Sequence, residues 1–358
     1  MKTSIKTILA AFAVIATMAS CQKNLARNEV EEAGKPCQLT VNLSGIEAPG
    51  TKVVGAQLAN EEKIKSVQIF VFKSENGKLD GSLYVDGLNA SKDWTGNTKI
   101  QCTYGNREVF ALVNAPANYV EGTYAITSKA ALLNLTTSLK DNAPDAFVMA
   151  GNNPVTEFRQ PQESVTVSVK RICAAVVLNE VKDDIYMPAY QSTGKLKITG
   201  AYLMNLPNLQ NLNFAQNQRS ASSVNDWLAK NGKAVEDKVK ALTVDTYDSA
   251  VQTVAYGQSL SVKSSFYAYP NELETESSEN WAKCSTYLVV EANIDGTDCV
   301  YPIKLKKLES NCKYEVNLTI HRLGSNPNEP WREVKFSEVT PVITVTPWTT
   351  GNPVNAVI

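Results

Sequence analysis

One segment in the last quarter of the chain has a strand–turn–strand pattern that leaves little choice of local structure. Residues 286–304 contain two strand-like runs on either side of Asp295-Gly296, a dipeptide typical of a tight type I′ turn. Pairing outward from this turn predicts three facing pairs, Ala292 with Cys299, Val290 with Tyr301 and Leu288 with Ile303. One face of the hairpin is then entirely apolar and must be covered by a core.

Further strand-like segments recur along the chain. Residues 64–72 contain alternating β-branched and aromatic residues and lead to the Asn76-Gly77 turn, which predicts a second hairpin. Further strands are expected at residues 39–43, 108–114, 165–169, 195–199, 314–320 and 342–346. Short strands with frequent turn signals are typical of β-sandwiches, and 358 residues are enough for roughly two ordinary domains. The sequence therefore predicts an all-β fold of two tandem β-sandwich domains with a few short helices.

Residues 172–178 are apolar at every position, which is typical of a central strand buried on both faces. The polar stretch at residues 182–194 follows, and we expect the boundary between the two domains there.

Two short helices are also expected. Ser128 is a suitable N-cap for a helix that carries Leu132, Leu135 and Leu139 at helical spacing. Ser223 opens a sequence that resembles a capping box, which predicts a helix over residues 227–230.

The N-terminus has the features of an export signal. Lys2 and Lys6 precede an apolar run over residues 8–18, which is shorter than the roughly 20 residues of a membrane-spanning helix. Small residues and Cys21 follow in the pattern of a bacterial lipobox. The sulfur of Cys21 would then carry a lipid that tethers the precursor to a membrane. An ordinary signal peptide with a chance cysteine is the alternative.

Two alternating strands lie near the two ends of the chain. Each places three apolar side chains on one face: Leu39, Val41 and Leu43 in the first strand, and Val354, Ala356 and Ile358 in the last. Lys52 and Val53 follow the first strand in a stretch with Pro and Gly, which suggests activation by proteolysis. Arg27 is an alternative site, but a cut there would leave the first strand attached.

Charge and cysteine usage restrict the function further. The formal net charge is −1, which gives no indication of a nucleic-acid partner. The chain has seven cysteines. Cys21 and Cys37 would leave with the N-terminal segment, and the odd number that remains cannot all pair. Cys173 and Cys299 are interpreted as small buried side chains and not as a disulfide framework. No C-x-x-C spacing indicates a metal, and no cofactor is expected.

No catalytic motif is present in the sequence. His321 stands at the end of an expected strand without an oriented partner, so a structural role is favoured over a catalytic or metal-binding role. The G-x-S-x-G elbow, the P-loop and the dinucleotide-binding glycine motif are absent. Aromatic residues such as those at 266–269 could bind sugars, but core packing is the favoured interpretation. We therefore expect no enzyme.

Several apolar patterns, taken in their order, resemble those of the fimbrillins, the FimA-type major fimbrial subunits of Bacteroidales type V pili. They follow the lipobox at residues 64–72, 109–114, 149–151, 169–175, 311–314 and 346–348. None is a strict signature, and their order and spacing over nearly the whole chain carry the resemblance.

This resemblance implies two transthyretin-like β-sandwich domains and export as an outer-membrane lipoprotein. It also implies cutting by an extracellular trypsin-like protease in the loop after the first strand, where this chain has Lys52 and family members commonly have Arg. The expected segments are a signal peptide at 1–20, a propeptide with a plug strand at 21–52, sandwiches at 53–185 and 186–348, and a donor strand at 349–358.

The implied function is that of a pilus stalk subunit in cell-surface fimbriae, which supports adhesion. After the plug strand has been cut free, the C-terminal strand of one subunit would fill the gap in the next. The expected partners are further copies of the chain, other pilus subunits, the protease, and a host or bacterial surface ligand. A pilus anchor, a tip adhesin and a glycan-binding surface lipoprotein that never polymerises are the alternatives.

Overall fold

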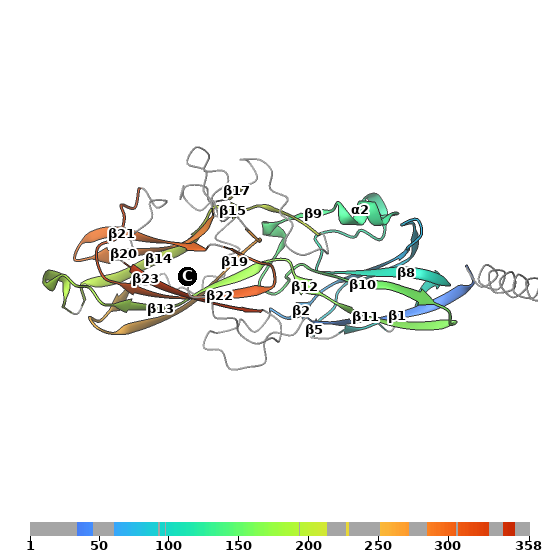
Figure 1. Cartoon of the computed structure of the whole chain (residues 1–358), viewed down its shortest axis with the longest axis horizontal. Coiled ribbons are helices and arrows are strands. Elements are labelled where there is room, and N and C mark those ends of the chain that lie inside the picture. Colours follow the sequence, from blue (N-terminus) through green and yellow to red (C-terminus); the bar gives the residue numbers. More distant parts are fainter. Residues whose placement is uncertain are drawn as a thin grey trace, which may run out of the picture.

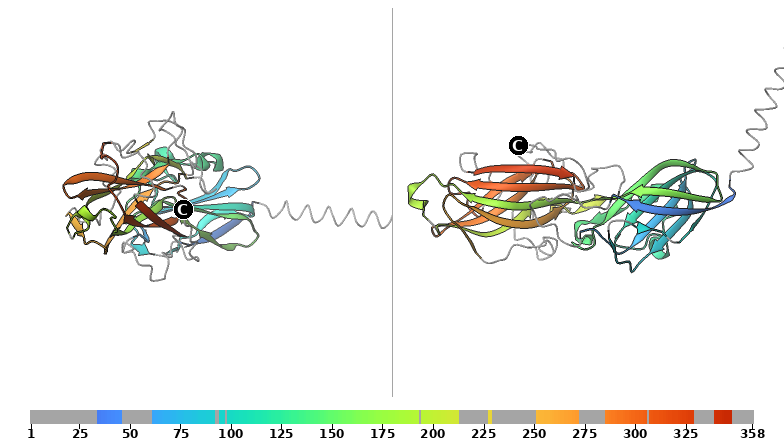
Figure 2. Two further views of the ribbon diagram at one scale, coloured as in Figure 1. Left: turned by 60° about the vertical axis from the view of Figure 1, so that its left-hand side comes forward. Right: turned by 90° about the horizontal axis from the view of Figure 1, so that it is seen from below.

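The computed structural model describes residues 34–45, 61–91, 94–96, 98–192, 194–212, 227–228, 251–271, 285–305, 307–328 and 339–347. These residues form two lobes arranged end to end along the long axis of the molecule (Figure 1). Each lobe contains two main β-sheets (Figure 2). The predicted all-β sandwich architecture is confirmed.

The N-lobe is built from a sheet of four strands and a sheet of five. The first sheet contains β1 (Pro36–Ser44), β6 (Trp94–Thr95), β7 (Ile100–Thr103) and β11 (Gln162–Ser168). The second sheet has the spatial order β12 (Lys170–Arg171), β10 (Met149–Phe158), β8 (Gly105–Val113), β3 (Val67–Lys73) and β4 (Leu79–Val85). A small ribbon pairs β2 (Lys63–Ile64) with β5 (Ala90–Ser91).

The C-lobe is built from two sheets of four strands. One has the order β19 (Ser259–Ala268), β13 (Ala174–Asp183), β22 (Cys312–Ile320) and β23 (Val339–Pro347). The other has the order β18 (Gln252–Val254), β14 (Leu196–Met204), β20 (Thr286–Ile294) and β21 (Thr297–Leu305). A ribbon of β9 (Thr136–Ser138) and β16 (Leu209–Asn211) joins residues that come before and after β13 in the chain.

The hairpin of β20 and β21 has the register that its sequence predicts. Ala292 is paired with Cys299, Val290 with Tyr301 and Leu288 with Ile303, and all six side chains are buried. Asp295 and Gly296 both have positive φ angles, as a type I′ turn requires. The Asn76-Gly77 turn likewise joins β3 to β4, as predicted.

The apolar run at residues 172–178 leads into β13, which lies between β19 and β22 as the expected central strand. Its residues 174–178 are all buried. Among the described residues, β13 pairs only with strands that follow it in the chain. The chain therefore passes from the N-lobe sheets to the C-lobe sheets before Ala174. The polar stretch at 182–194 lies beyond this change, and the domain limits at 185 and 186 remain predictions.

The helices in the described residues are few and short, as expected. Ser128 caps α2 (Lys129–Leu133) by accepting a hydrogen bond from the backbone N–H of Ala131. This helix ends before Leu135, and Leu139 belongs to a separate turn of 3₁₀ helix, η2 (Leu139–Asp141). The other short helices are η1 (Gly122–Tyr124) and η3 (Pro188–Tyr190).

The helix expected over residues 227–230 is wrong at its first two positions. Trp227 and Leu228 form strand β17, which pairs with β15 (Leu206–Pro207). Tryptophan is a strand-favouring residue, and pairing with a distant segment outweighs the local capping signal. Ser223 lies outside the described residues.

One buried asparagine holds together several loops around the end of β8. The Asn114 side chain accepts hydrogen bonds from the backbone N–H groups of Lys65 and Ser66, at 2.8 and 3.3 Å. It donates to the carbonyl groups of Lys63 and Phe147, at 2.9 and 3.1 Å. Its own φ angle is +55°, a conformation that Asn tolerates better than most residues.

We expect Asn114→Ala to lower the free energy of unfolding by about 2–4 kcal/mol, because buried polar groups left without partners cost about 1–3 kcal/mol each. Chemical denaturation measures this loss. The control Asn106→Ala changes an exposed side chain on β8, the strand that Asn114 follows, and should stay within about 0.5 kcal/mol of the wild type. Equal stabilities for the two variants would contradict the role given to Asn114.

Candidate functional site: the N-terminal strand and its groove

The N-terminal strand β1 presents a continuous apolar row to the interior of the N-lobe. Leu39, Val41 and Leu43 are buried on the same face, and Cys37 extends the row by one position. The residues between them, such as Gln38 and Thr40, are exposed or half-buried. Fully burying one such aliphatic side chain contributes about 1.5–3 kcal/mol, so the row anchors the strand firmly.

Both edges of β1 are hydrogen-bonded to other strands. On one side, residues 38–44 pair in parallel with residues 162–168 of β11. On the other side, β1 pairs antiparallel with β7 near its beginning and with β6 near its end. Within the described ranges, every pairing of this sheet includes β1. Without β1, the edges of β11, β6 and β7 would be unpaired and the apolar groove between them would be open.

A buried ion pair lies beside the beginning of β1. The Arg107 guanidinium donates to the Asp80 carboxylate at 2.7 Å, and the side chains are only 3% and 4% exposed. Arg107 also donates to the carbonyl groups of Asn106 and Tyr104, while Thr103 donates its backbone N–H to Asp80 at 2.8 Å. Thr103 is the register partner of Pro36, so this network supports the strand next to the start of β1.

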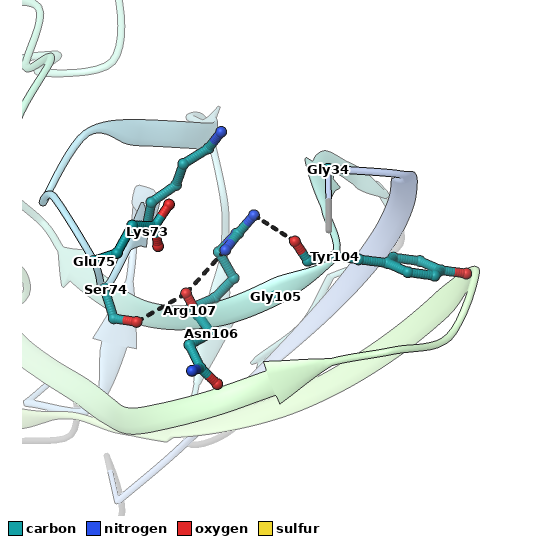
Figure 3. A pocket seen from close by; sticks show the side chains of 8 residues that line it. All are labelled: Gly34, Lys73, Ser74, Glu75, Tyr104, Gly105, Asn106 and Arg107. Carbon is teal, nitrogen blue, oxygen red and sulfur yellow. Dashed lines mark hydrogen bonds between the residues drawn. The ribbon is translucent and has the colours of Figure 1, made fainter. Parts of the chain in front are cut away.

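The same network forms the wall of an open cavity of about 530 Å³ (Figure 3). Its lining residues are Gly34, Lys73, Ser74, Glu75, Tyr104, Gly105, Asn106 and Arg107. The Arg107 side chain turns toward the protein backbone here, as the dashed lines of Figure 3 show. Arg107 therefore holds neighbouring strands together through its hydrogen bonds, and this structural role explains why a cationic side chain lines the cavity.

The environment of Asp80 changes its titration. Burial by itself would raise the pKa of the Asp80 carboxyl, but hydrogen bonds from Arg107 and Thr103 outweigh it and hold the pKa below the ordinary value of 3.8. The charged carboxylate is therefore favoured in the folded state.

The other end of β1 lies close to the junction of the two lobes. Val169 donates its backbone N–H to the carbonyl of Ser44, at 2.9 Å. The chain returns to the described structure at Glu61, whose carbonyl accepts a hydrogen bond from the buried Arg171 guanidinium at 2.9 Å. Tyr267 of the C-lobe donates its hydroxyl to the Glu61 carboxylate. The segment after β1 therefore ends in contacts at the junction.

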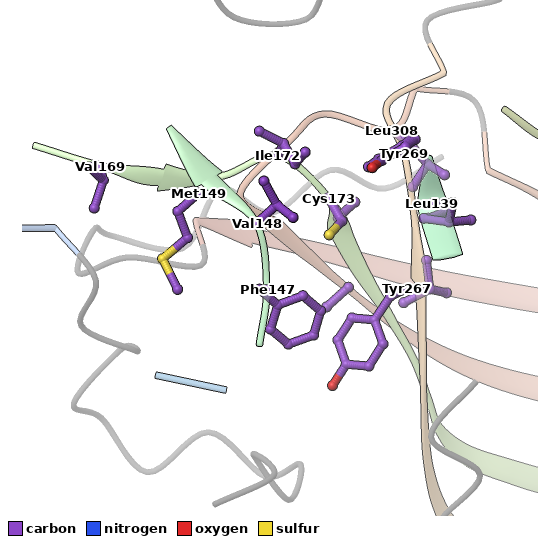
Figure 4. Packing of buried hydrophobic residues seen from close by; sticks show 14 of the residues in the cluster. Leu139, Phe147, Val148, Met149, Val169, Ile172, Cys173, Tyr267, Tyr269 and Leu308 are labelled. Atoms are coloured by element: carbon purple, nitrogen blue, oxygen red, sulfur yellow. The ribbon is translucent and has the colours of Figure 1, made fainter. Parts of the chain in front are cut away.

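Apolar and aromatic side chains from both lobes fill this junction (Figure 4). The rings of Phe147 and Tyr267 are 4.6 Å apart between centroids and tilted by 59°. Asn142 donates to the Tyr269 hydroxyl at 3.0 Å, and the Cys173 thiol lies 3.3 Å from the Asn142 amide oxygen. Burial raises the pKa of the Cys173 thiol to about 12, in keeping with its interpretation as a small buried side chain.

Most of the sequence-predicted site residues fall outside the described residues. These are Cys21, Arg27, Lys52, Val53, Val354, Ala356 and Ile358. The structure brings Leu39, Val41 and Leu43 together in the groove. The sequence analysis missed the contribution of Cys37 and the Asp80–Arg107 pair. Cys37 stands two positions before Leu39, and this spacing could have placed it in the same apolar row. The Asp80–Arg107 pair could not be predicted in this way, because it joins residues on two different strands.

The described part of the chain contains the single histidine, His321, and no cluster of three or more potential metal ligands. His321 is buried, its ring stacks on Tyr186 at 4.6 Å, and its Nδ1 atom lies 3.2 Å from the Asp184 carbonyl oxygen. The same atom lies 3.4 Å from the Asp184 carboxylate, so His321 has an oriented partner that its sequence did not indicate. The contacts with Tyr186 and Asp184 hold the ring just after β22. No helix in the described ranges is long and apolar enough to cross a membrane.

Part of the chain matches the model of one protein family. Residues 37–198, somewhat less than half of the chain, match the family of the major fimbrial subunit protein (FimA). The matched region begins in β1 and ends in β14. No curated protein sequence gives a significant match.

Solved structures with a similar fold include proteins from two named bacteria. A candidate cell adhesion protein from Parabacteroides distasonis has a TM-score of 0.61 at 13% identity, over 89% of this chain and 98% of its own. A fimbrilin from Porphyromonas gingivalis has a TM-score of 0.59 at 16% identity, over 88% of this chain and 98% of its own. At these identities the likeness concerns the fold.

Replacing Asp80 by Asn should destabilise the protein by about 3–5 kcal/mol at pH 7, because the buried Arg107 loses its counter-charge. The pKa of Asp80 is lower in the folded state than in the unfolded state, so its charged carboxylate stabilises the fold above pH 3.8. This stabilisation is lost as the pH falls through the folded-state pKa. The difference between wild type and variant should therefore shrink in acid.

Denaturation curves at several pH values test this expectation. Asp145→Asn is the matched control, because Asp145 and Lys65 form a surface pair with side chains 42% and 47% exposed. Such pairs contribute about 0–1 kcal/mol. A constant difference for Asp80→Asn from pH 7 down to acid would refute the electrostatic explanation.

Proposed function

We propose that the protein is a pilus stalk subunit that polymerises by exchange of β-strands, because residues 37–198 match the family of FimA major fimbrial subunits. The family assignment supports a pilus-related function at the cell surface. In the proposal, removal of β1 by proteolysis precedes its replacement by a strand from another copy.

The position of β1 is the observation that carries this proposal. A strand paired on both edges, whose neighbours have no other described partner in that sheet, leaves a ready-made site for an incoming strand when it departs. Main-chain hydrogen bonds to both edges would give the new strand affinity, and the apolar groove would select its side chains.

Proteolysis at Lys52 would separate β1 from the rest of the chain. Lys52 lies in the segment that connects Gly45, just after β1, to Glu61 at the lobe junction. The mature chain would begin at Val53, and Arg171 and Tyr267 would hold it from Glu61 onward. A trypsin-like extracellular protease fits the lysine side chain.

Residues 349–358 are the proposed donor. They follow directly after β23 and Trp348, and Val354, Ala356 and Ile358 repeat the spacing of Leu39, Val41 and Leu43. A nine-residue strand such as β1 spans about 30 Å, and ten residues can cover that length. Donation from one copy to the next without rotational closure produces a filament.

The proposal also includes export as an outer-membrane lipoprotein through Cys21, and assembly with other pilus subunits. A surface ligand would be bound by the finished fimbria. A stalk subunit needs both the cut after β1 and the donor strand, whereas an anchor would keep β1 and the lipid. A mature N-terminus at Val53 distinguishes the stalk subunit from an anchor that begins at a lipidated Cys21.

We expect Lys52→Ala to yield folded, secreted monomer that does not polymerise, since β1 stays covalently attached. Electron microscopy and sizing of the surface material measure fibre formation, and N-terminal sequencing locates the cut. The control Arg27→Ala removes the alternative cleavage site and should form normal fibres that begin at Val53. Normal fibres from Lys52→Ala would refute the cleavage step.

Deleting residues 351–358 should leave a subunit that accepts a strand but cannot donate one. The cut protein should therefore remain monomeric alone and terminate growing fibres of the wild type. Val354→Asp places a charge on the inward face and should also block donation, whereas Asn355→Asp on the opposite face should not. Long polymers of the truncated protein alone would exclude this donor.

A further inference from the structure

Two cysteines face each other across the N-terminal strand and its neighbour. Cys37 of β1 and Cys102 of β7 are register partners in the antiparallel pair, and their sulfur atoms are 3.6 Å apart. Their exposed fractions are 1% and 4%. Both side chains therefore lie on the inner face of the same sheet and point into the same part of the core.

This arrangement is compatible with a covalent bond. Directly opposite residues in antiparallel strands have Cβ atoms about 4.5–5.5 Å apart, close to the roughly 3.5–4.5 Å found in disulfides. The corresponding Cα separation of about 4.5–5.5 Å lies within the usual disulfide range. Small side-chain rotations would therefore bring the two sulfur atoms from contact to bonding distance without a change of strand register.

We propose that Cys37 and Cys102 are a disulfide site that fastens β1 to β7 in the exported protein. The two thiols together lose two protons and two electrons and form one S–S bond. The acceptor is the disulfide of an envelope thiol–disulfide oxidoreductase, which becomes a dithiol. Proteins at the cell surface pass through compartments in which such bonds form and persist.

Burial restricts when this reaction takes place. The thiolate is the form that attacks a disulfide, and burial raises the pKa of both the Cys37 and the Cys102 thiol. In the docked strand the thiolates are scarce and shielded from an oxidoreductase. The bond therefore forms during folding, while β1 is still accessible, and it is protected once β1 has docked.

The consequence for assembly rests on the proposed strand exchange. Cys37 lies on the side of Lys52 that departs, and Cys102 lies on the side that remains. A cut at Lys52 alone therefore leaves β1 covalently attached to the groove. A dithiol reductant must also return the bond to two thiols, by the reverse electron transfer, before a donor strand can replace β1.

The bond is tested on the full chain exported through its own leader and isolated without reductant. Free thiols are alkylated under denaturing conditions, and the protein is digested and mapped by mass spectrometry. We expect a peptide pair joined through Cys37 and Cys102 that separates on reduction. Alkylation of both residues in most molecules would overturn the proposal.

The fastening is tested by limited cutting at Lys52 with a Lys/Arg-specific protease, followed by a denaturing gel without reductant. The fragment that carries Cys37 should stay with the wild-type remainder and should be lost from it in Cys37→Ser and Cys102→Ser. Cys312→Ser, which changes a free thiol elsewhere, should retain it. Equal retention in all four proteins would contradict the bond.

Polymer formation by the cut proteins separates this inference from the proposed function. If both hold, the wild type polymerises only after reduction, and Cys37→Ser polymerises without it. If cut wild type forms fibres without reductant, and mapping of that protein finds both cysteines as alkylated free thiols, the disulfide is refuted and strand exchange is supported. A mapped disulfide, together with failure of cut Cys37→Ser to polymerise after its fragment is lost, would support the bond and refute strand exchange.

Discussion

The N-lobe depends on the hydrogen-bond ladders that β1 makes on both of its edges. In the described structure β11, β6 and β7 are joined into one sheet only through this strand. An inner strand is normally the strand that is hardest to remove from a sheet, because its removal leaves two unpaired edges and exposes part of the core. Here the inner strand is the first described element of the chain, and it is connected to the rest by one segment after Gly45.

Independent interactions hold the surroundings of β1 at each end. Near its beginning, the Asp80–Arg107 pair and Thr103 fix the adjoining strand, and none of these groups belongs to β1. Near its end, Glu61, Arg171 and Tyr267 connect the returning chain to the lobe junction. The groove is therefore supported by residues outside β1, as the proposed strand exchange requires.

Much of the local structure could be predicted from the sequence, because turn chemistry and alternation act over short distances. The Asp295-Gly296 turn set the register of β20 and β21, and uniform apolarity identified β13 as a central strand. Trp227 and Leu228 were wrongly expected in a helix, because their strand partner lies elsewhere in the chain. The parallel pairing of β1 with β11 and the meeting of Cys37 with Cys102 depend on distant segments, and no local pattern specifies such partners.

The direction of the strands has a mechanical consequence. In both lobes the main strands run roughly along the long axis of the molecule (Figure 1). Tension applied along that axis would act on β1 and β11 in shear, so that their hydrogen bonds share the force and must yield together. A strand held in the same orientation by the same groove would resist tension equally well, whereas a force across the axis would unzip it one bond at a time.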